Sequence, residues 1–282
     1  MSQELTSPSE VFRLDPAVYL SDRAKEWLWK GFMAFWILYI LAPPILLLFI
    51  STDTVSYVRV PQGFTLEKYE LMLESGPLIS AMEQSLKLAV VTMIVAPALA
   101  LLAVLSYRKT SYKALFVGAM ILPLFVPGVV QGFSLLMLFT QIGFGHSFLS
   151  TLIGHVIWSF PFAFLVILTS MSTVRDDVLL ASSDLGANEF ETFRHVILPQ
   201  IKPGLISAVI FSFVLSFNEF SRTVYLQFGE NTIPTYVFAK LQVDLSPEIF
   251  AIAGLTVVMS FVLIAVAIVV LYQSSSQQEE EH

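Results

Sequence analysis

The 282-residue sequence has no cysteine, which excludes disulfides, cysteine-ligated zinc, thiol catalysis and iron–sulfur clusters. Its few histidines are scattered without the spacing of paired metal ligands, so we expect no metal site; they are His146, His155, His195 and His282. A Gly-x4-Gly-Lys-Ser/Thr loop, which binds nucleotide phosphates, is also missing. The chain therefore binds no ATP of its own.

Charge is scarce as well. Charged residues make up 13% of the chain, hydrophobic residues 56%, and the mean hydropathy is +0.75. This composition excludes an ordinary soluble enzyme. The net charge is -7 and the pI is about 5.1, so the chain lacks the basic surplus with which proteins bind nucleic acid.

Long apolar blocks are what the sequence does contain. Each is about 20 residues or longer, the length that a helix needs to cross a hydrocarbon core about 30 Å thick. We therefore predict an all-α membrane protein embedded in a lipid bilayer. The six predicted transmembrane helices cover residues 31–52, 82–106, 114–141, 148–171, 203–227 and 247–272.

The distribution of basic residues predicts the topology. An even number of spans puts both termini on one side of the membrane. If that side is the cytoplasm, ten Lys and Arg residues lie on inside segments and three on outside loops. This asymmetry satisfies the positive-inside rule, so we predict cytoplasmic N- and C-termini.

The ends of the chain differ from this transmembrane domain, which we assign to residues 30–272. Residues 1–29 are polar, and Asp15-Pro16 has the pattern of a helix start. They form either an interfacial helix or a tail followed by an early start of the first span. Residues 273–282 are predicted to be a disordered tail. Prolines within the spans, at positions 97, 123, 127 and 161, predict kinked helices around a cavity.

The loop between the fourth and fifth spans, residues 172–202, is too long for a simple connection. Asp176-Asp177 starts a short helix that runs to Gly186, and Asn188 with Glu191 has capping-box spacing for a second helix that Pro199 ends. Small residues in the first helix would let another protein approach closely. The alternative is an amphipathic hairpin that lies on the membrane.

The order of residues in this loop resembles a known family. The segments that carry the resemblance are Asp184-Leu185-Gly186-Ala187-Asn188, Phe193, Val196-Ile197-Leu198-Pro199 and Lys202-Pro203-Gly204-Leu205. They resemble the cytoplasmic EAA loop of permease subunits of type I ABC importers, in which a coupling helix docks on the ATPase. Leu180-Ala181-Ser182 stands where the family has Glu-Ala-Ala, so the glutamate of the motif is absent. The resemblance assigns ATPase docking to Leu180, Ala181, Ser182, Asp184, Leu185, Gly186 and Ala187.

Other segments resemble the spermidine/putrescine branch of that family. They are Ser216-Phe217-Asn218-Glu219-Phe220, Ile233-Pro234 and Leu245-Ser246-Pro247-Glu248. The branches for ferric iron, thiamine and opines share parts of this pattern. The resemblance implies a bacterial-type inner membrane, a second permease subunit, two ATPase subunits that bind ATP and magnesium, and an extracytoplasmic solute-binding protein. It also implies transport of a small polar or cationic solute by alternating access.

Ionisable residues within spans are costly and tend to face a cavity or a partner. Glu219 and Arg222 are spaced to pair with each other, or Glu219 and Asn218 face a solute pathway. The residues that we consider for this pathway are Trp158, Phe217, Asn218, Glu219, Arg222 and Tyr225. His155 is interpreted as a histidine that bonds another helix, and Glu83 with Lys87 as an interfacial ion pair.

Two other functional classes compete with the importer. A secondary transporter coupled to protons through Glu219 would not need the long docking loop. An intramembrane enzyme would need His-Glu-x-x-His, Gly-x-Ser-x-Gly or a pair of intramembrane aspartates, none of which the sequence contains. We therefore predict a transport subunit with no catalytic residues.

Overall fold

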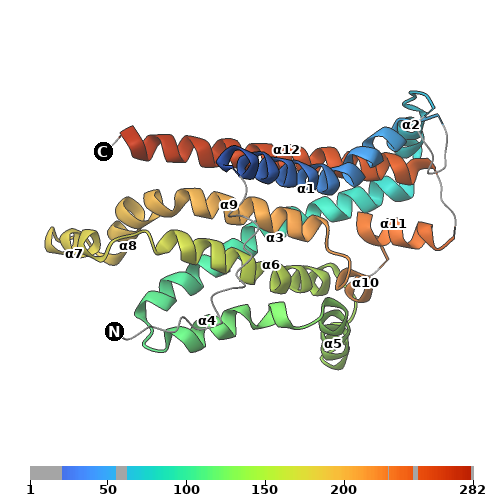
Figure 1. The fold of residues 1–282 in the computed structure, drawn as a ribbon. Coiled ribbons are helices and arrows are strands. Elements are labelled where there is room, and N and C mark those ends of the chain that lie inside the picture. Colours follow the sequence, from blue (N-terminus) through green and yellow to red (C-terminus); the bar gives the residue numbers. More distant parts are fainter. Residues whose placement is uncertain (1–20, 55–61, 228, 244–246, 281–282) are drawn as a thin grey trace, which may run out of the picture.

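The computed structural model describes residues 21–54, 62–227, 229–243 and 247–280. Every regular element in these ranges is a helix, as predicted. Most long helices run side by side in an elongated bundle (Figure 1). Residues 1–20, which include the predicted helix start at Asp15-Pro16, lie outside the described residues.

Five helices are long and apolar enough to cross a membrane. They are α1 (Asp22–Ser51), α3 (Gly76–Lys109), α6 (Phe148–Met171), α9 (Leu198–Phe217) and α12 (Pro247–Glu280). Shorter helices gather at the two ends of the bundle. The α11 end carries α2 (Glu67–Glu74), α10 (Thr223–Leu226) and α11 (Ile233–Leu241), and the α7 end carries α7 (Asp176–Asp184) and α8 (Glu189–Thr192) (Figure 1).

The third predicted span, residues 114–141, is not one kinked helix. It consists of α4 (Lys113–Ile121), a 3-10 turn (Leu122–Phe125) and α5 (Gly128–Gln141), with a bend of 96° between the two helical parts. Pro123 and Pro127 explain the break, because each lacks an amide donor and disfavours a helical residue before it. The described chain therefore has five spans, or six if this bent pair is counted as one.

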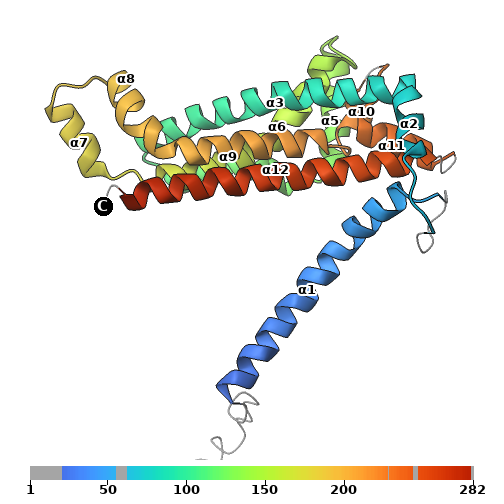
Figure 2. The ribbon, with the colours of Figure 1, turned by 90° about the horizontal axis from the view of Figure 1, so that it is seen from above.

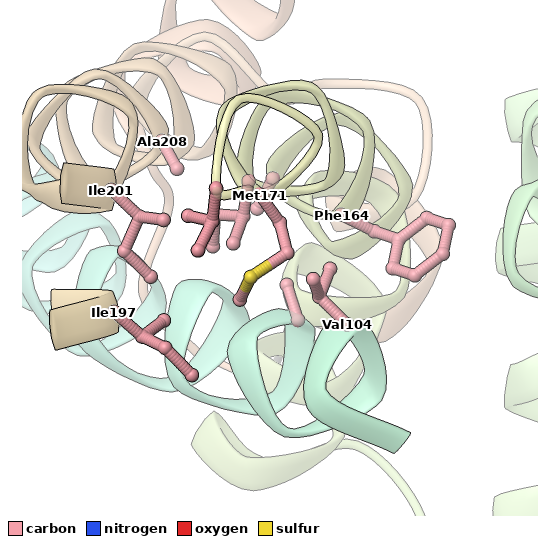
Figure 3. Packing of buried hydrophobic residues seen from close by; sticks show 10 residues of the cluster. Val104, Phe164, Met171, Ile197, Ile201 and Ala208 are labelled. Atoms are coloured by element: carbon pink, nitrogen blue, oxygen red, sulfur yellow. The ribbon is translucent and has the colours of Figure 1, made fainter. Parts of the chain in front are cut away.

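The core lies where α3, α6 and α9 pack together. Its side chains are mainly aliphatic, with small residues between them, and include Val104, Phe164, Met171, Ile197, Ile201 and Ala208 (Figure 3). At the closest approach, a Cβ atom on Gly204 of α9 would lie 1.7 Å from the Ser170 hydroxyl of α6. Gly204 is thus required by close helix packing, which is typical of membrane bundles.

Among the described residues, α1 packs against the other helices only near its C-terminal end (Figure 2). Figure 2 shows it meeting α12 beside α2 and then running away from the bundle. At the junction the Ser51 hydroxyl lies 2.9 Å from the Tyr69 hydroxyl of α2, and Gly254 of α12 leaves room for both. Residues 22–29 form the first turns of α1, which continues from them into the apolar span.

Two buried charges secure the turn that follows α1. The Asp53 carboxylate accepts hydrogen bonds from the backbone N–H groups of Gln62 (2.9 Å), Gly63 (3.0 Å) and Thr54 (2.8 Å). These bonds, that of Gln62 first, hold the pKa of Asp53 below its usual value. The Lys68 ammonium donates to the Ile50 carbonyl over 2.7 Å, and burial lowers the pKa of this lysine.

The end of the chain also differs from the prediction. A disordered tail was expected from residue 273, but α12 continues through Glu280. The sequence after Gly254 contains no glycine or proline, and its Gln and Glu residues favour helix, so nothing local ends α12 where the apolar block ends.

We expect Gly204→Val to destabilise the protein by about 1–3 kcal/mol, because the added carbons collide with Ser170 and force α6 and α9 apart. Thermal unfolding in detergent measures the effect. Gly118→Val in α4 is the matched control, since a Cβ there meets no atom within 4 Å. Equal melting temperatures for the two variants would contradict the packing role.

Candidate functional site

The 172–202 loop folds as the sequence predicts over most of its length. α7 ends in a Schellman motif, in which the Ala187 N–H bonds to the Ser182 carbonyl (3.1 Å) and the Gly186 N–H to the Ser183 carbonyl (2.9 Å). Gly186 has a φ angle of +84°, a backbone conformation that residues with a Cβ atom rarely adopt. The predicted capping box is present, since Asn188 accepts from the Glu191 N–H and Glu191 accepts from the Asn188 N–H.

Pro199 does not end the second helix. α8 passes through a π-helical turn (Phe193–Ile197) directly into α9, in whose first turn Pro199 lies. A proline is tolerated there because the wider π turn before it shifts the backbone bonding pattern, with the Leu198 N–H bonded to the Phe193 carbonyl. The loop and the fifth span therefore form one continuous rod from Glu189 to Phe217.

The loop is fixed to the bundle through adjacent residues at the end of α3. Arg108 pairs with Asp176 of α7 over 2.6 Å, and Lys109 pairs with Glu189 of α8 over 2.8 Å. Within the loop, the hydroxyls of Ser182 and Thr192 lie 2.6 Å apart. Both helices of the loop are thus held against the same helix end.

The predicted docking residues divide into two groups. Leu180 is 67% exposed and Leu185 89% exposed, and Ala181, Asp184 and Gly186 are exposed beside them. These five residues are called the docking face below. Ser182 is buried and bonds Thr192, so it supports the loop from inside, and Ala187 is half-buried.

A second polar cluster lies within the membrane-spanning part, where α5, α6, α9 and α10 meet. At its centre Arg222 donates from its guanidinium to Glu219 (3.0 Å) and to Gln131 of α5, and its backbone N–H bonds Glu219 over 2.8 Å. The guanidinium also lies 4.3 Å from the centre of the Trp158 ring. Both charged side chains are almost fully buried. The Glu219–Arg222 pair that the spacing allows is therefore formed.

His155 extends the cluster across α6. Its Nδ1 lies 2.7 Å from the Ser216 hydroxyl and its Nε2 2.8 Å from the Thr223 hydroxyl, so it bonds other elements as predicted. The Thr223 hydroxyl donates to the Glu219 carbonyl over 2.8 Å. That hydroxyl therefore accepts from Nε2, which leaves Nδ1 to accept from Ser216. The hydrogen bonds thus favour one neutral tautomer.

Glycines in α5 and α6 allow the Arg222–Leu226 segment to pack closely against both helices. A Cβ on Gly132 would lie 2.9 Å from the Arg222 Cα, and one on Gly154 would lie 2.6 Å from a Leu226 methyl. Sequence reasoning missed Gln131 and the glycines beside it. The available signal was Gly128-Val-Val-Gln-Gly132, a Gly-x3-Gly spacing typical of close helix contacts in membranes.

The six pathway candidates do not form one surface. Trp158, Glu219 and Arg222 belong to the buried cluster, and Tyr225 packs edge-on against Phe133 at its border. Phe217 is buried in another apolar cluster with Ile233 and Tyr236, and Asn218 is exposed and bonds its own helix. Nearby at the α11 end, a cavity of about 50 Å³ is lined by Gln84, Leu88, Phe148, Thr151, Gln227, Glu230 and Thr232.

No group of three or more His, Asp or Glu side chains in the described residues is arranged to hold a metal ion. The polar groups of the buried cluster instead bond one another.

A family comparison decides the class of the protein. The model of the family "Binding-protein-dependent transport system inner membrane component" matches residues 93–279, about two thirds of the sequence. The chain belongs to this family. The match includes the 172–202 loop, α9 and the buried cluster, and therefore supports the resemblance noted in those residues.

Individual relatives define the branch. The spermidine/putrescine transport system permease protein PotC of Escherichia coli (strain K12) is 30% identical over 237 residues, covering 83% of this chain and 90% of that protein. The putrescine transport system permease protein PotI of the same strain is 28% identical over 230 residues, covering 77% and 81%. The chain is thus a type I ABC importer permease of the polyamine branch.

A solved structure shares the fold. It is the crystal structure of a bacterial ABC transporter involved in the import of the acidic polysaccharide alginate, and it matches with a TM-score of 0.67 at 14% identity, covering 89% of this chain and 96% of the other. This similarity concerns the arrangement of helices alone.

We expect Glu219→Gln to destabilise the protein by about 3–5 kcal/mol, because it leaves the Arg222 charge buried without its counter-ion. Thermal unfolding in detergent measures this loss. Glu83→Gln is the control, since it breaks an exposed i,i+4 pair with Lys87 that is worth about 0.5 kcal/mol or less.

The double variant Glu219→Gln/Arg222→Gln tests the cause. It removes both charges and is expected to be more stable than Glu219→Gln alone. If Glu219→Gln has the same melting temperature as Glu83→Gln, the Glu219–Arg222 pair does not stabilise the protein as expected.

Proposed function

We propose that this chain is the membrane permease subunit of an ATP-driven, solute-binding-protein-dependent importer of polyamines or a related small cationic solute. Its assembly contains a second permease, two ATPase subunits and an extracytoplasmic binding protein. The family match carries this proposal, because the family is described by its dependence on a binding protein. The relatives at about 30% identity support a polyamine as the solute.

In this proposal the α7 end lies in the cytoplasm. Arg108, Lys109, Lys113, Arg175 and Lys202 all lie at or next to this end of the described helices, where the positive-inside rule puts basic residues. The same orientation makes both termini cytoplasmic. The α11 end, with Glu230 at its small cavity, then faces the binding protein.

The docking face receives the ATPase. Leu180 of α7 and Leu185 at its end are large apolar side chains that are mostly exposed among the described residues, and the neighbouring small residues allow close approach. Because α7 joins α8 through the short Gly186 turn and α8 continues into α9 without a break, movement of the ATPase subunits is passed to a membrane span. Alternating access then follows from ATP-driven closure of the ATPase pair.

The solute pathway runs beside the buried cluster. In the described state Glu219 is neutralised by Arg222, whose guanidinium also occupies the face of Trp158. A cationic solute therefore competes with Arg222 for these two groups, and the cluster must rearrange before Glu219 binds it. Of the other three candidates, Tyr225 of α10 borders this region, whereas Phe217 and Asn218 lie at the end of α9 in other surroundings.

Reconstitution tests the proposal. The chain is co-expressed with the permease, ATPase and binding-protein genes that adjoin its own, and the purified complex is placed in liposomes with ATP inside. We expect uptake of labelled spermidine or putrescine that requires ATP and the binding protein. Uptake driven by a proton gradient without ATP would instead support a secondary transporter, and failure of the chain to co-purify with any ATPase would refute the importer.

We expect Leu185→Asp to reduce co-purification of the ATPase and ATP-driven uptake at least tenfold, because it puts a charge into an apolar contact. The melting temperature of the isolated permease should not change, since the side chain touches little else. Tyr112→Ser, which alters a 76% exposed residue at the same end but outside the loop, serves as control. Full ATPase binding by Leu185→Asp would argue against the docking face.

A further inference from the structure

A separate cavity lies at the α7 end, between α3, α4 and α6. Its volume is about 370 Å³, and it is lined by Tyr107, Arg108, Lys113, Leu168, Met171, Ser172, Val174 and Asp176. Neither the docking face nor the buried Glu219–Arg222 cluster contributes to this lining. The proposed function leaves the cavity without a role.

The polar side of the cavity is basic. Arg108 lies in the last turn of α3 and Lys113 begins α4, so the short connection between two membrane helices brings two cations to one opening. The Lys113 ammonium lies 5.6 Å from the centre of the Tyr107 ring, which holds it over the opening. Arg108 is only partly engaged by Asp176, whose own side chain is 89% exposed. Both cations therefore retain donors for an anion.

The other side of the cavity is apolar and continues onto a membrane-facing surface. Leu168, Met171 and Val174 line its wall. From Lys113, α4 and the 3-10 turn after it carry large apolar side chains outward, since Leu115 of α4 is 73% exposed and Leu122 of the turn is 61% exposed. A ligand with a charged head and a long apolar tail fits this combination better than a soluble anion does.

We propose that this cavity binds the phosphate headgroup of an anionic phospholipid from the leaflet at the α7 end, with an acyl chain lying along α4. Lys113 and Arg108 contact the phosphate, and Tyr107 holds Lys113 in position. Basic pockets between membrane helices are a recognised means of binding anionic headgroups. Because Arg108 also holds Asp176, the bound lipid contacts the first turn of α7 and helps to fix the 172–202 loop.

Native mass spectrometry of the full-length permease in detergent tests this site with added dioleoyl phosphatidylglycerol. Phosphatidylcholine of the same chain length and inorganic phosphate serve as the comparison ligands. We expect phosphatidylglycerol to be retained in preference to both. Lys113→Gln should weaken its binding roughly fivefold, as expected for the loss of one lysine close to an anionic headgroup.

Lys202→Gln is the matched control, because it removes an exposed charge at the same end that does not line the cavity. It should bind phosphatidylglycerol as the original chain does. Wild-type binding by Lys113→Gln, or equal losses in both variants, would refute the site. Displacement of the lipid by millimolar inorganic phosphate would show that the cavity takes a free anion and would refute the lipid assignment. Lys113→Gln keeps the Arg108–Asp176 pair, so its effect is separate from damage to the loop.

Discussion

The arrangement of this permease depends on how its broken helices satisfy their backbone polar groups in a medium without water. Two spans are interrupted, one between α4 and α5 and the other after α9, and both interruptions meet at Arg222. Gln131 donates to the carbonyl of Pro123 at the first break and accepts from Arg222, whose own N–H bonds Glu219 at the second break. The polar groups at each break are therefore hydrogen-bonded by groups from the other break, and the two breaks stabilise each other.

This dependence explains which features the sequence predicted. Apolar length and the basic residues between spans identified a helical membrane protein, because both follow from the bilayer and not from tertiary contacts. The helix, glycine turn and capping box of the 172–202 loop were predictable for the same reason, since Gly186, Asn188 and Glu191 act within a few residues. The 96° bend was not predicted, because prolines within spans usually kink a helix, and the contacts of Gln131 at this break join residues far apart in sequence.

The candidate pathway was only partly predictable. Spacing indicated that Glu219 and Arg222 were able to pair, but their burial and the contact with Gln131 come from a helix 91 residues away in sequence. Phe217 and Asn218 directly precede Glu219 in the chain, yet Phe217 is buried in another cluster and Asn218 is exposed. The reason is that α9 ends at Phe217, so helical periodicity no longer relates these positions. Likewise, Pro199 marks no boundary once the π turn is formed.

The attachment of the loop to α3 has a mechanical consequence. α3 is a single helix of 34 residues, about 50 Å long, that reaches from one end of the bundle to the other. It holds the loop by two ion pairs whose acidic partners are largely exposed, and such pairs weaken as salt screens them. The connection from α8 into α9 is covalent and does not depend on salt. The attachment to α3 depends on the two ion pairs and therefore weakens as ionic strength rises. The same loop is thus attached to the membrane helices through one covalent connection and one salt-dependent connection.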